Sequence, residues 1–161
     1  MESDGIKKIS KAGLLAALTF VVTMAIHFPL PGVGYVHPGD AIVFLCGAFV
    51  SPLHAFLAAG IGSALADLAL GYVVYVPATF VIKGLAALFA ALIYRRNLRM
   101  SRFVLGGFAG AAVIVAGYFG FETVLYGFPT ALTSVLPNTV QVLFGIFAAV
   151  IFKSQVGAGK S

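Results

Sequence analysis

Long apolar runs, separated by short stretches of polar residues, proline and glycine, make up most of this chain. A transmembrane helix needs about 20 mostly apolar residues. The runs predict six spans, at residues 8–28, 39–50, 53–71, 78–94, 103–126 and 130–152. The second span is short, and prolines between residues 29 and 38 prevent a helix from continuing into it. We therefore predict an all-α integral membrane protein with six transmembrane helices in a single domain, residues 1–161.

The composition agrees with a membrane protein and excludes several other classes. Of the 161 residues, 61% are hydrophobic and 9% are charged, whereas a soluble domain carries about 25% charged residues. The single cysteine, Cys46, excludes an intrachain disulfide. The chain has neither a helical histidine pair at zinc spacing nor a recognisable nucleophile motif. We therefore expect a protein that is not an enzyme and holds no metal or cofactor of its own.

The basic residues lie at the ends of the apolar runs. Lysine and arginine mark the cytoplasmic flanks of membrane spans, and six spans place all these clusters on one side. Both termini are then cytoplasmic, and the distribution favours membrane topology over nucleic-acid binding. We expect a multi-pass protein of a bacterial plasma membrane. The clusters comprise Lys7, Lys8, Lys11, Arg95, Arg96, Arg99, Arg102, Lys153 and Lys160.

Charged residues inside the apolar runs indicate a binding site. An ionised side chain at the bilayer centre costs at least about 2.5–3.5 kcal/mol. Such side chains therefore face the protein interior, pair with each other, or contact a ligand. Asp40, Asp67, Lys83 and Glu122 are in this position. The predicted topology brings the three carboxylates toward the outer side, which indicates a small-molecule site open to one face.

Two of the carboxylates also have a structural interpretation. Asp40 opens the second span, where a carboxylate stabilises the free N–H groups of a helix N-terminus. Asp67 shares a helix face with Gly60 and Ser63, and small residues permit close helix packing. Asp67 is therefore expected to point into the bundle. An Asp67–Lys83 ion pair is an alternative to ligand contact, although such a pair could still line a pocket.

The last two spans add further polar candidates. Glu122 lies one turn from Tyr118 and one turn from Tyr126, so a carboxylate is presented between two phenols. Asn138 and Gln141 share a face of the sixth span. Buried amides need partners, and hydrogen bonds between helices are the alternative to ligand binding for both.

Together these residues predict a pocket with aromatic walls, amides and carboxylates. Most tyrosines also fall near the outer side, although an interfacial aromatic belt would explain some of them. Such a pocket suits a flat, polar heterocycle with ring nitrogens, hydroxyl or amino groups, rather than a lipid or a bare metal ion. The predicted ligand-binding residues are His37, Asp40, Asp67, Tyr72, Tyr75, Lys83, Tyr118, Glu122, Asn138 and Gln141.

Several short stretches are typical of one family of small membrane proteins. They are the pair Ala12 and Ala16, the run His37-Pro38-Gly39-Asp40-Ala41, and residues 62–72, 77–84 and 137–141. With these stretches the chain resembles, over nearly its whole length, the S components of energy-coupling-factor (ECF) vitamin transporters. Within that family it is most similar to the branch associated with hydroxymethylpyrimidine, vitamin B6 or related precursors.

The resemblance implies a function, partners and roles for some residues. An S component captures a vitamin from outside and docks on a transmembrane coupling protein that is driven by two ATPase subunits. ATP is then used by the partners and not by this chain. Ala12 and Ala16 would form the docking surface, and the loops at residues 35–40 and 72–77 would form a lid. A B6 vitamer such as pyridoxine is the first expected ligand, followed by hydroxymethylpyrimidine.

Two other functions remain as alternatives at this point. The intramembrane carboxylates would also serve an autonomous, proton-coupled carrier of a polar heterocycle. The chain shows no clear inverted repeat of the kind that such carriers often have. An integral-membrane enzyme ranks last because no nucleophile or metal set is recognisable.

Overall fold

The structure is a computed structural model that describes residues 2–30, 34–95 and 99–158. Arg96 and Lys160, two members of the predicted basic clusters, lie outside these residues. Within them the chain forms six helices and one short hairpin. The elements are α1 (Glu2–Ala25), β1 (Phe28–Pro29), β2 (Tyr35–Val36), α2 (Asp40–Phe49), α3 (Pro52–Ala69), α4 (Val76–Tyr94), α5 (Met100–Tyr126) and α6 (Phe128–Ala158).

The six predicted helices are confirmed, but they are not equally long. Five of them are long and apolar enough to cross a membrane. Helix α2 has 10 residues and is therefore about 15 Å long, roughly half of a 30 Å hydrocarbon core. The chain thus has five full-length helices and one short helix buried among them.

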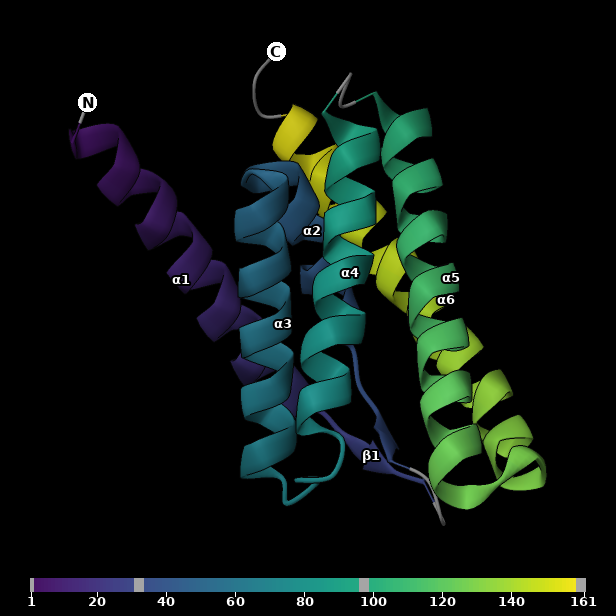
Figure 1. The fold of residues 1–161 in the computed structure, drawn as a ribbon. Helices are drawn as coiled ribbons and strands as arrows, with labels where there is room; N and C mark the ends of the chain where they lie inside the picture. The colour runs from purple at the N-terminus through teal and green to yellow at the C-terminus, as the bar shows by residue number, and fades with distance from the viewer. Residues whose placement is uncertain (1, 31–33, 96–98, 159–161) are drawn as a thin grey trace.

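Helix α2 is short because it begins inside the bundle. The chain turns back through the antiparallel pair β1–β2, and the segment after β2 runs up between the helices to the start of α2 (Figure 1). Non-helical backbone at membrane depth is tolerated where it is buried in protein. Here the N–H groups of Ala41 and Ile42 are bonded to the carbonyls of Pro38 and Gly39, at 3.1 and 2.9 Å. Asp40 consequently lies deep in the bundle and not at its outer surface.

The two ends of the bundle differ in charge. The start of α1 and the end of α6 lie at one end, together with the end of α4 and the start of α5 (Figure 1). The described basic residues of the predicted clusters belong to the segments at this end, and the positive-inside rule predicts that it is cytoplasmic. The opposite end, here called the outer end, carries the β1–β2 hairpin and the α3–α4 and α5–α6 connections.

Helix α1 is the least enclosed of the long helices. Its apolar window is 17% buried, against 33–50% for the other four, and its N-terminal half diverges from the bundle (Figure 1). Its C-terminal half packs closely on α3 at Gly62, where an added Cβ would lie 2.4 Å from the carbonyl oxygen of Ala16. Ala12 and Ala16 are half-buried, so part of the predicted docking surface is used within the bundle. Its contact with a partner protein remains a prediction.

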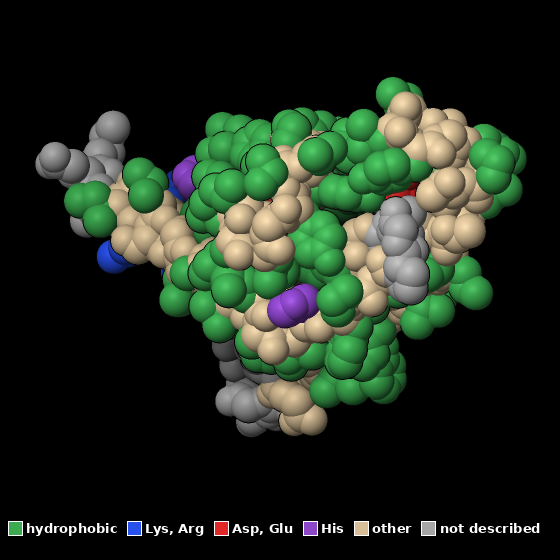
Figure 2. Space-filling model, turned by 90° about the horizontal axis from the view of Figure 1, so that it is seen from below, with side chains coloured by type: hydrophobic (Ala, Val, Ile, Leu, Met, Phe, Trp, Pro, Cys, Tyr) green, Lys and Arg blue, Asp and Glu red, His purple; other side chains and the backbone are tan. Residues whose placement is uncertain are grey.

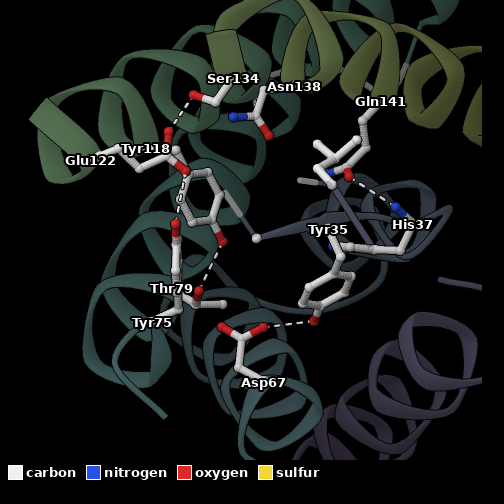
Figure 3. A pocket seen from close by; sticks show the side chains of 12 residues that line it. Tyr35, His37, Asp67, Tyr75, Thr79, Tyr118, Glu122, Ser134, Asn138 and Gln141 are labelled. Atoms are coloured by element: carbon white, nitrogen blue, oxygen red, sulfur yellow. Dashed lines mark hydrogen bonds between the residues drawn. The ribbon is translucent and has the colours of Figure 1, made fainter. Parts of the chain in front are cut away.

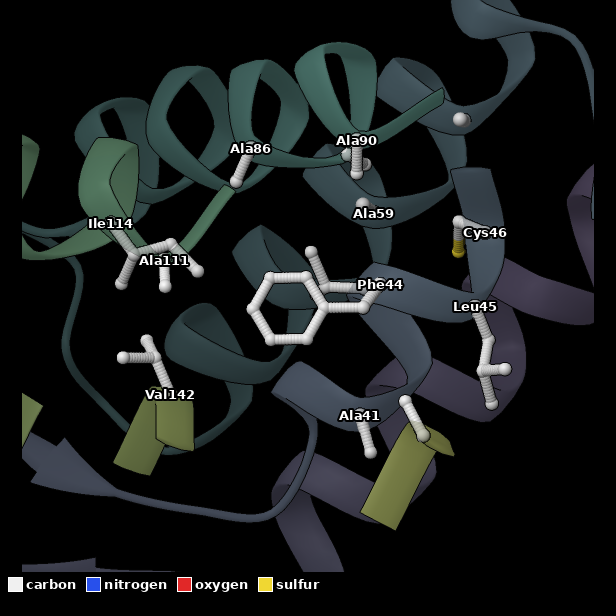
Figure 4. Close-up of a cluster of buried hydrophobic side chains, with 14 of the residues drawn as sticks. Ala41, Phe44, Leu45, Cys46, Ala59, Ala86, Ala90, Ala111, Ile114 and Val142 are labelled. Carbon is white, nitrogen blue, oxygen red and sulfur yellow. The ribbon is translucent and has the colours of Figure 1, made fainter. Parts of the chain in front are cut away.

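The core is built around α2. Phe44 is fully buried and lies among small side chains of α3, α4 and α5, with Ala86, Ala90 and Ala111 around its ring (Figure 4). A glycine of α5 takes part in the same close packing. Gly110 lies against Ala86 and Phe44, with no room for a larger side chain. Small residues on the outer helices thus permit a short, bulky helix at the centre.

Candidate functional site

A cavity in the outer half of the bundle collects most of the predicted site. It lies among the ends of α3 and α5, the starts of α4 and α6, and the chain around the hairpin (Figure 3). Seven of the ten predicted ligand-binding residues line it: His37, Asp67, Tyr75, Tyr118, Glu122, Asn138 and Gln141. The other lining residues are Leu30, Gly34, Tyr35, Thr79 and Ser134.

Asp67 forms one wall of this cavity from the last turn of α3. As predicted, it points into the bundle, with 4% of its surface exposed. Tyr35 Oη donates a hydrogen bond to Asp67 Oδ1 at 2.6 Å. Burial and the neighbouring carboxylate raise the pKa of the Tyr35 phenol, which therefore keeps its proton. Asp67 Oδ2 is buried and has no hydrogen-bond partner among the described residues, so this carboxylate has acceptor capacity left for a ligand.

Glu122 forms the opposite wall from α5. Tyr75 Oη donates to Glu122 Oε1 at 3.2 Å, and Ser134 Oγ donates to Glu122 Oε2. The carboxylate is thereby held between α4 and α6 (Figure 3). Tyr118 lies one turn from Glu122 on α5, but it has a different partner. Tyr118 Oη instead shares a hydrogen bond of 2.9 Å with Thr79 Oγ1 of α4.

A row of four tyrosine rings lies at the cavity, and three of them line it. The ring centroids of Tyr35 and Tyr72 are 4.8 Å apart, those of Tyr72 and Tyr75 are 6.3 Å apart, and those of Tyr75 and Tyr118 are 6.4 Å apart. Such separations are in the range of favourable aromatic pairs. Tyr72 itself does not line the cavity. It supports Tyr35 and Tyr75, and it is therefore placed to act on the ligand through those two rings.

His37 connects the hairpin with the floor of the cavity. Its backbone N–H donates to Gln141 Oε1 at 2.9 Å, and its Nδ1 accepts from the Gly39 N–H at 3.1 Å. Burial first, and then the charge of Lys83, lower the pKa of His37 to about 3, so the imidazole is neutral at ordinary pH. Residue 39 must be glycine, because an added Cβ would lie 2.1 Å from Thr23 Oγ1 of α1.

Asp40 and Lys83, both predicted to bind the ligand, lie behind the cavity and do not line it. They form an ion pair with each other. The alternative of an Asp67–Lys83 pair is therefore wrong in this structure. The physical reason is depth: α2 begins in the interior, and this brings the Asp40 carboxylate to the level of Lys83. Both side chains are fully buried, and a buried charge needs its partner.

Three of the polar or aromatic lining residues were not among the predicted ligand contacts, namely Tyr35, Thr79 and Ser134. The sequence did contain a signal for two of them. Ser134 lies one turn before Asn138 on α6, and Thr79 lies one turn before Lys83 on α4, so each extends a polar helix face. Tyr35 lacks such a signal, because its position depends on the hairpin and not on a helical period.

The outer surface above the cavity is weakly charged. Seen from the outer end, hydrophobic and uncharged side chains dominate, and an acidic side chain is visible at the bottom of a hollow (Figure 2). In this view lysine and arginine are visible only at the edge, beside the N-terminal part of the chain (Figure 2). No lysine or arginine is among the residues found to line the cavity. The site therefore offers mainly acceptors and favours a ligand that carries donors or positive charge.

The cavity is also narrow, with a volume of about 30 Å³. This is room for a few water molecules at most, so an aromatic ligand requires side chains to move apart. Tyr35 is best placed to move, because it lies on the short hairpin and a single hydrogen bond joins its hydroxyl to Asp67. Tyr35 belongs to the predicted lid at residues 35–40, and the opening of that lid remains a prediction.

The chain is similar to several known proteins. The family model "ECF-type riboflavin transporter, S component" matches residues 3–157. A curated protein of Pyrococcus woesei, named "Uncharacterized protein in gap 3'region", is 33% identical over 142 residues, which cover 85% of this chain and 95% of that protein. The thiamine precursor transporter HmpT of Lactococcus lactis subsp. cremoris (strain MG1363) is 27% identical over 162 residues, which cover 97% of this chain and 91% of that protein.

One solved structure has the same fold. It is described as "Structure and mechanism of the S component of a bacterial ECF transporter", and it matches with a TM-score of 0.74. The match covers 100% of both chains at 20% sequence identity. The likeness therefore extends over the whole chain and shows the fold.

Proposed function

The chain belongs to the ECF-type riboflavin transporter S component family, and on this premise we propose that it captures a small pyrimidine or pyridine, hydroxymethylpyrimidine first and a B6 vitamer such as pyridoxine second, for ATP-driven uptake. Family membership confirms the prediction of a multi-pass membrane protein that is a substrate-binding transport subunit and not an enzyme. It also confirms the partners, since S components associate with a membrane coupling protein and two ATPases. In the proposal ATP is used by these partners.

One observation carries the choice of ligand. Two buried carboxylates, Asp67 from α3 and Glu122 from α5, line the same aromatic cavity, and no basic residue is found in its lining. A carboxylate is an acceptor only, so the two carboxylates suit a ligand that carries more than one hydrogen-bond donor. Hydroxymethylpyrimidine has an amino group and a hydroxymethyl group on neighbouring carbons of one flat ring, and pyridoxine has three hydroxyl groups on its ring.

The same observation argues against phosphorylated vitamers. A phosphate monoester carries about −1.5 to −2 charges at pH 7 and would lie beside Asp67 and Glu122 without a cation in the described lining. The likeness to HmpT favours hydroxymethylpyrimidine over pyridoxine, the reverse of the order expected from the sequence alone.

The first experiment is to identify what the protein carries. The chain is purified in detergent without added vitamin and denatured, and the released small molecules are identified by mass spectrometry. Titration calorimetry then compares hydroxymethylpyrimidine, pyridoxine, pyridoxal phosphate and riboflavin. We expect binding of the first or second and none of pyridoxal phosphate. Tight binding of riboflavin alone would contradict the proposed ligand class but not the family.

A second experiment separates the proposal from an autonomous carrier. Purified chain in proteoliposomes is tested for uptake of hydroxymethylpyrimidine, with and without an imposed proton gradient. We expect binding without accumulation unless the coupling protein and ATPases are present. Accumulation that is driven by the gradient alone would contradict the proposed dependence on ATP.

A further inference from the structure

The Asp40–Lys83 pair has an unusual place in the molecule, because it is fully buried and yet lies directly behind the cavity. Both residues have 0% of their surface exposed, and neither lines the cavity. A buried ion pair adds little stability compared with apolar residues of similar size. Its retention in the core of a membrane protein therefore calls for a function beyond packing.

The pair contacts groups that do form the cavity. Asp40 Oδ2 accepts a hydrogen bond from Gln141 Nε2 at 2.7 Å, and Gln141 Oε1 in turn accepts from the His37 backbone N–H at 2.9 Å. On the other side, Lys83 Nζ lies 5.4 Å from the centroid of the Tyr118 ring. The ion pair thus contacts lining residues of α5 and α6 directly, and it is linked through Gln141 to the segment after β2.

We propose that the Asp40–Lys83 pair is a positioning unit that sets the orientation of the Gln141 amide, and with it the pattern of donors and acceptors at the floor of the cavity. The inference rests on the proposed binding function of this cavity. In this role neither residue touches the ligand. Asp40 acts through Gln141, and Lys83 keeps the Asp40 carboxylate charged and in place.

The physical basis is that the two ends of an amide have nearly the same shape but opposite hydrogen-bonding character. A carboxylate only accepts, so Asp40 requires the NH₂ group of Gln141 to face it. The oxygen of Gln141 then faces the His37 N–H. If Gln141 were flipped in the wild type, it would be mismatched at both ends, with its oxygen toward the Asp40 carboxylate and its NH₂ group toward the His37 N–H. If residue 40 were a neutral asparagine, its own amide could donate or accept, and only the His37 N–H would still select the orientation. The flipped amide would then be less disfavoured, and the ligand would meet a larger share of the wrong pattern.

The test uses a double variant, because either single change leaves a buried, unpaired charge. Asp40→Asn with Lys83→Met removes both charges and keeps similar side-chain lengths. We expect this variant to fold, with a melting temperature in detergent close to that of the wild type, but to bind hydroxymethylpyrimidine and pyridoxine roughly tenfold more weakly. Wild-type affinity in the folded double variant would overturn the proposal.

A mutant cycle distinguishes positioning from direct contact. The double change is also made in a Gln141→Ala background, and the four affinities are compared. If Asp40 acts through Gln141, the double change has no further effect once Gln141 is absent, and the coupling is about as large as the effect itself. If Asp40 or Lys83 contacts the ligand, the two effects add, and the proposal is wrong.

A third readout needs no ligand. Hydrogen–deuterium exchange is measured on the peptide that contains His37, whose N–H is bonded to Gln141 Oε1. We expect faster exchange there in the double variant and unchanged exchange in Ser63→Ala. Ser63 is a matched control, because it is buried, does not line the cavity and has no partner for its hydroxyl among the described residues. If the wild type bound neither hydroxymethylpyrimidine nor pyridoxine, the proposed function would fail. The exchange rate at His37 would still test whether the Asp40–Lys83 pair positions Gln141.

Discussion

Asp40 and Asp67 are both buried aspartates in the bundle, but the structure gives them opposite surroundings. Asp40 is bonded through one oxygen to Lys83 and through the other to Gln141. Asp67 is bonded through one oxygen to the Tyr35 phenol, and its other oxygen has no partner among the described residues. Only Asp67 lines the cavity. The comparison teaches that burial alone does not identify a ligand-binding carboxylate. Unused acceptor capacity toward a cavity is the better criterion.

The comparison between Asp40 and Asp67 is tested most strongly by removing Lys83, the cationic partner of Asp40. Lys83→Met leaves the Asp40 carboxylate buried without its partner, and this costs about 3–5 kcal/mol of folding free energy. We expect a large fall in melting temperature, measured by differential scanning fluorimetry in detergent without ligand. Asp40→Asn with Lys83→Met serves as the control and should recover most of the loss. A Lys83→Met protein as stable as the wild type would show that Asp40 is not held as an ion.

The same change in charge at Asp67 should affect binding and not folding. Asp67→Asn keeps the shape and an oxygen that can accept from Tyr35, but it removes the charge-assisted bond to a ligand donor. Such a bond is worth about 1.5–3 kcal/mol, so we expect roughly 10- to 100-fold weaker binding of hydroxymethylpyrimidine by calorimetry. A loss of thermal stability without a loss of affinity would show that Asp67 serves folding and not ligand binding.

His37 adds a pH dependence to the network of Asp40. Its pKa is about 3 in the folded protein and about 6.5 when unfolded. Below pH 6.5 the unfolded chain therefore binds a proton that the folded chain does not. The free energy of unfolding consequently decreases as the pH is lowered, by up to about 1.4 kcal/mol per pH unit. We expect a loss of about 1.6 kcal/mol from this residue between pH 6.5 and pH 5.

The matched variant for this prediction is His37→Asn. An asparagine oxygen can accept from the N–H two residues later, as His37 Nδ1 does from Gly39, but it does not titrate. Melting temperatures of the two proteins are compared across this pH range without ligand, so that other titrating groups cancel. Parallel curves would contradict a neutral, buried His37.

Glu122 is intermediate between the two aspartates, since both its oxygens have partners but it lines the cavity. Glu122→Gln should weaken binding at least about tenfold, or 1.4 kcal/mol, while the protein still folds. Asn138→Ala is expected to act in the same way. Calorimetry and thermal melting of both variants check this. Unchanged affinity in both would remove this side of the cavity from the site.

The sequence predicted most members of the site but not how they pair. Asp67, Glu122, Asn138 and Gln141 were found because polar residues on one face of an apolar helix point into the bundle. Partners depend on how far each helix is shifted along its neighbours, and helical periodicity carries no information on that shift. Lys83 was therefore placed beside Asp67, whereas its partner is Asp40. Glu122 is bonded to Tyr75, which directly precedes α4, and to Ser134 of α6. The span that carries Glu122 held no signal for either partner.

By itself, the sequence determined that the chain inserts into a lipid bilayer, how many helices it forms and on which side of the membrane the polar groups gather. The reason is that the hydrophobic effect and the positive-inside rule act on composition and local order. Only the tertiary structure decided that α2 begins at mid-depth. It also decided that both carboxylate oxygens of Asp40 have partners, whereas one oxygen of Asp67 has none among the described residues. These features arise from contacts between residues far apart in the chain, such as Asp40 with Lys83 and Gln141. Close packing of the core fixes the positions of such residues relative to one another.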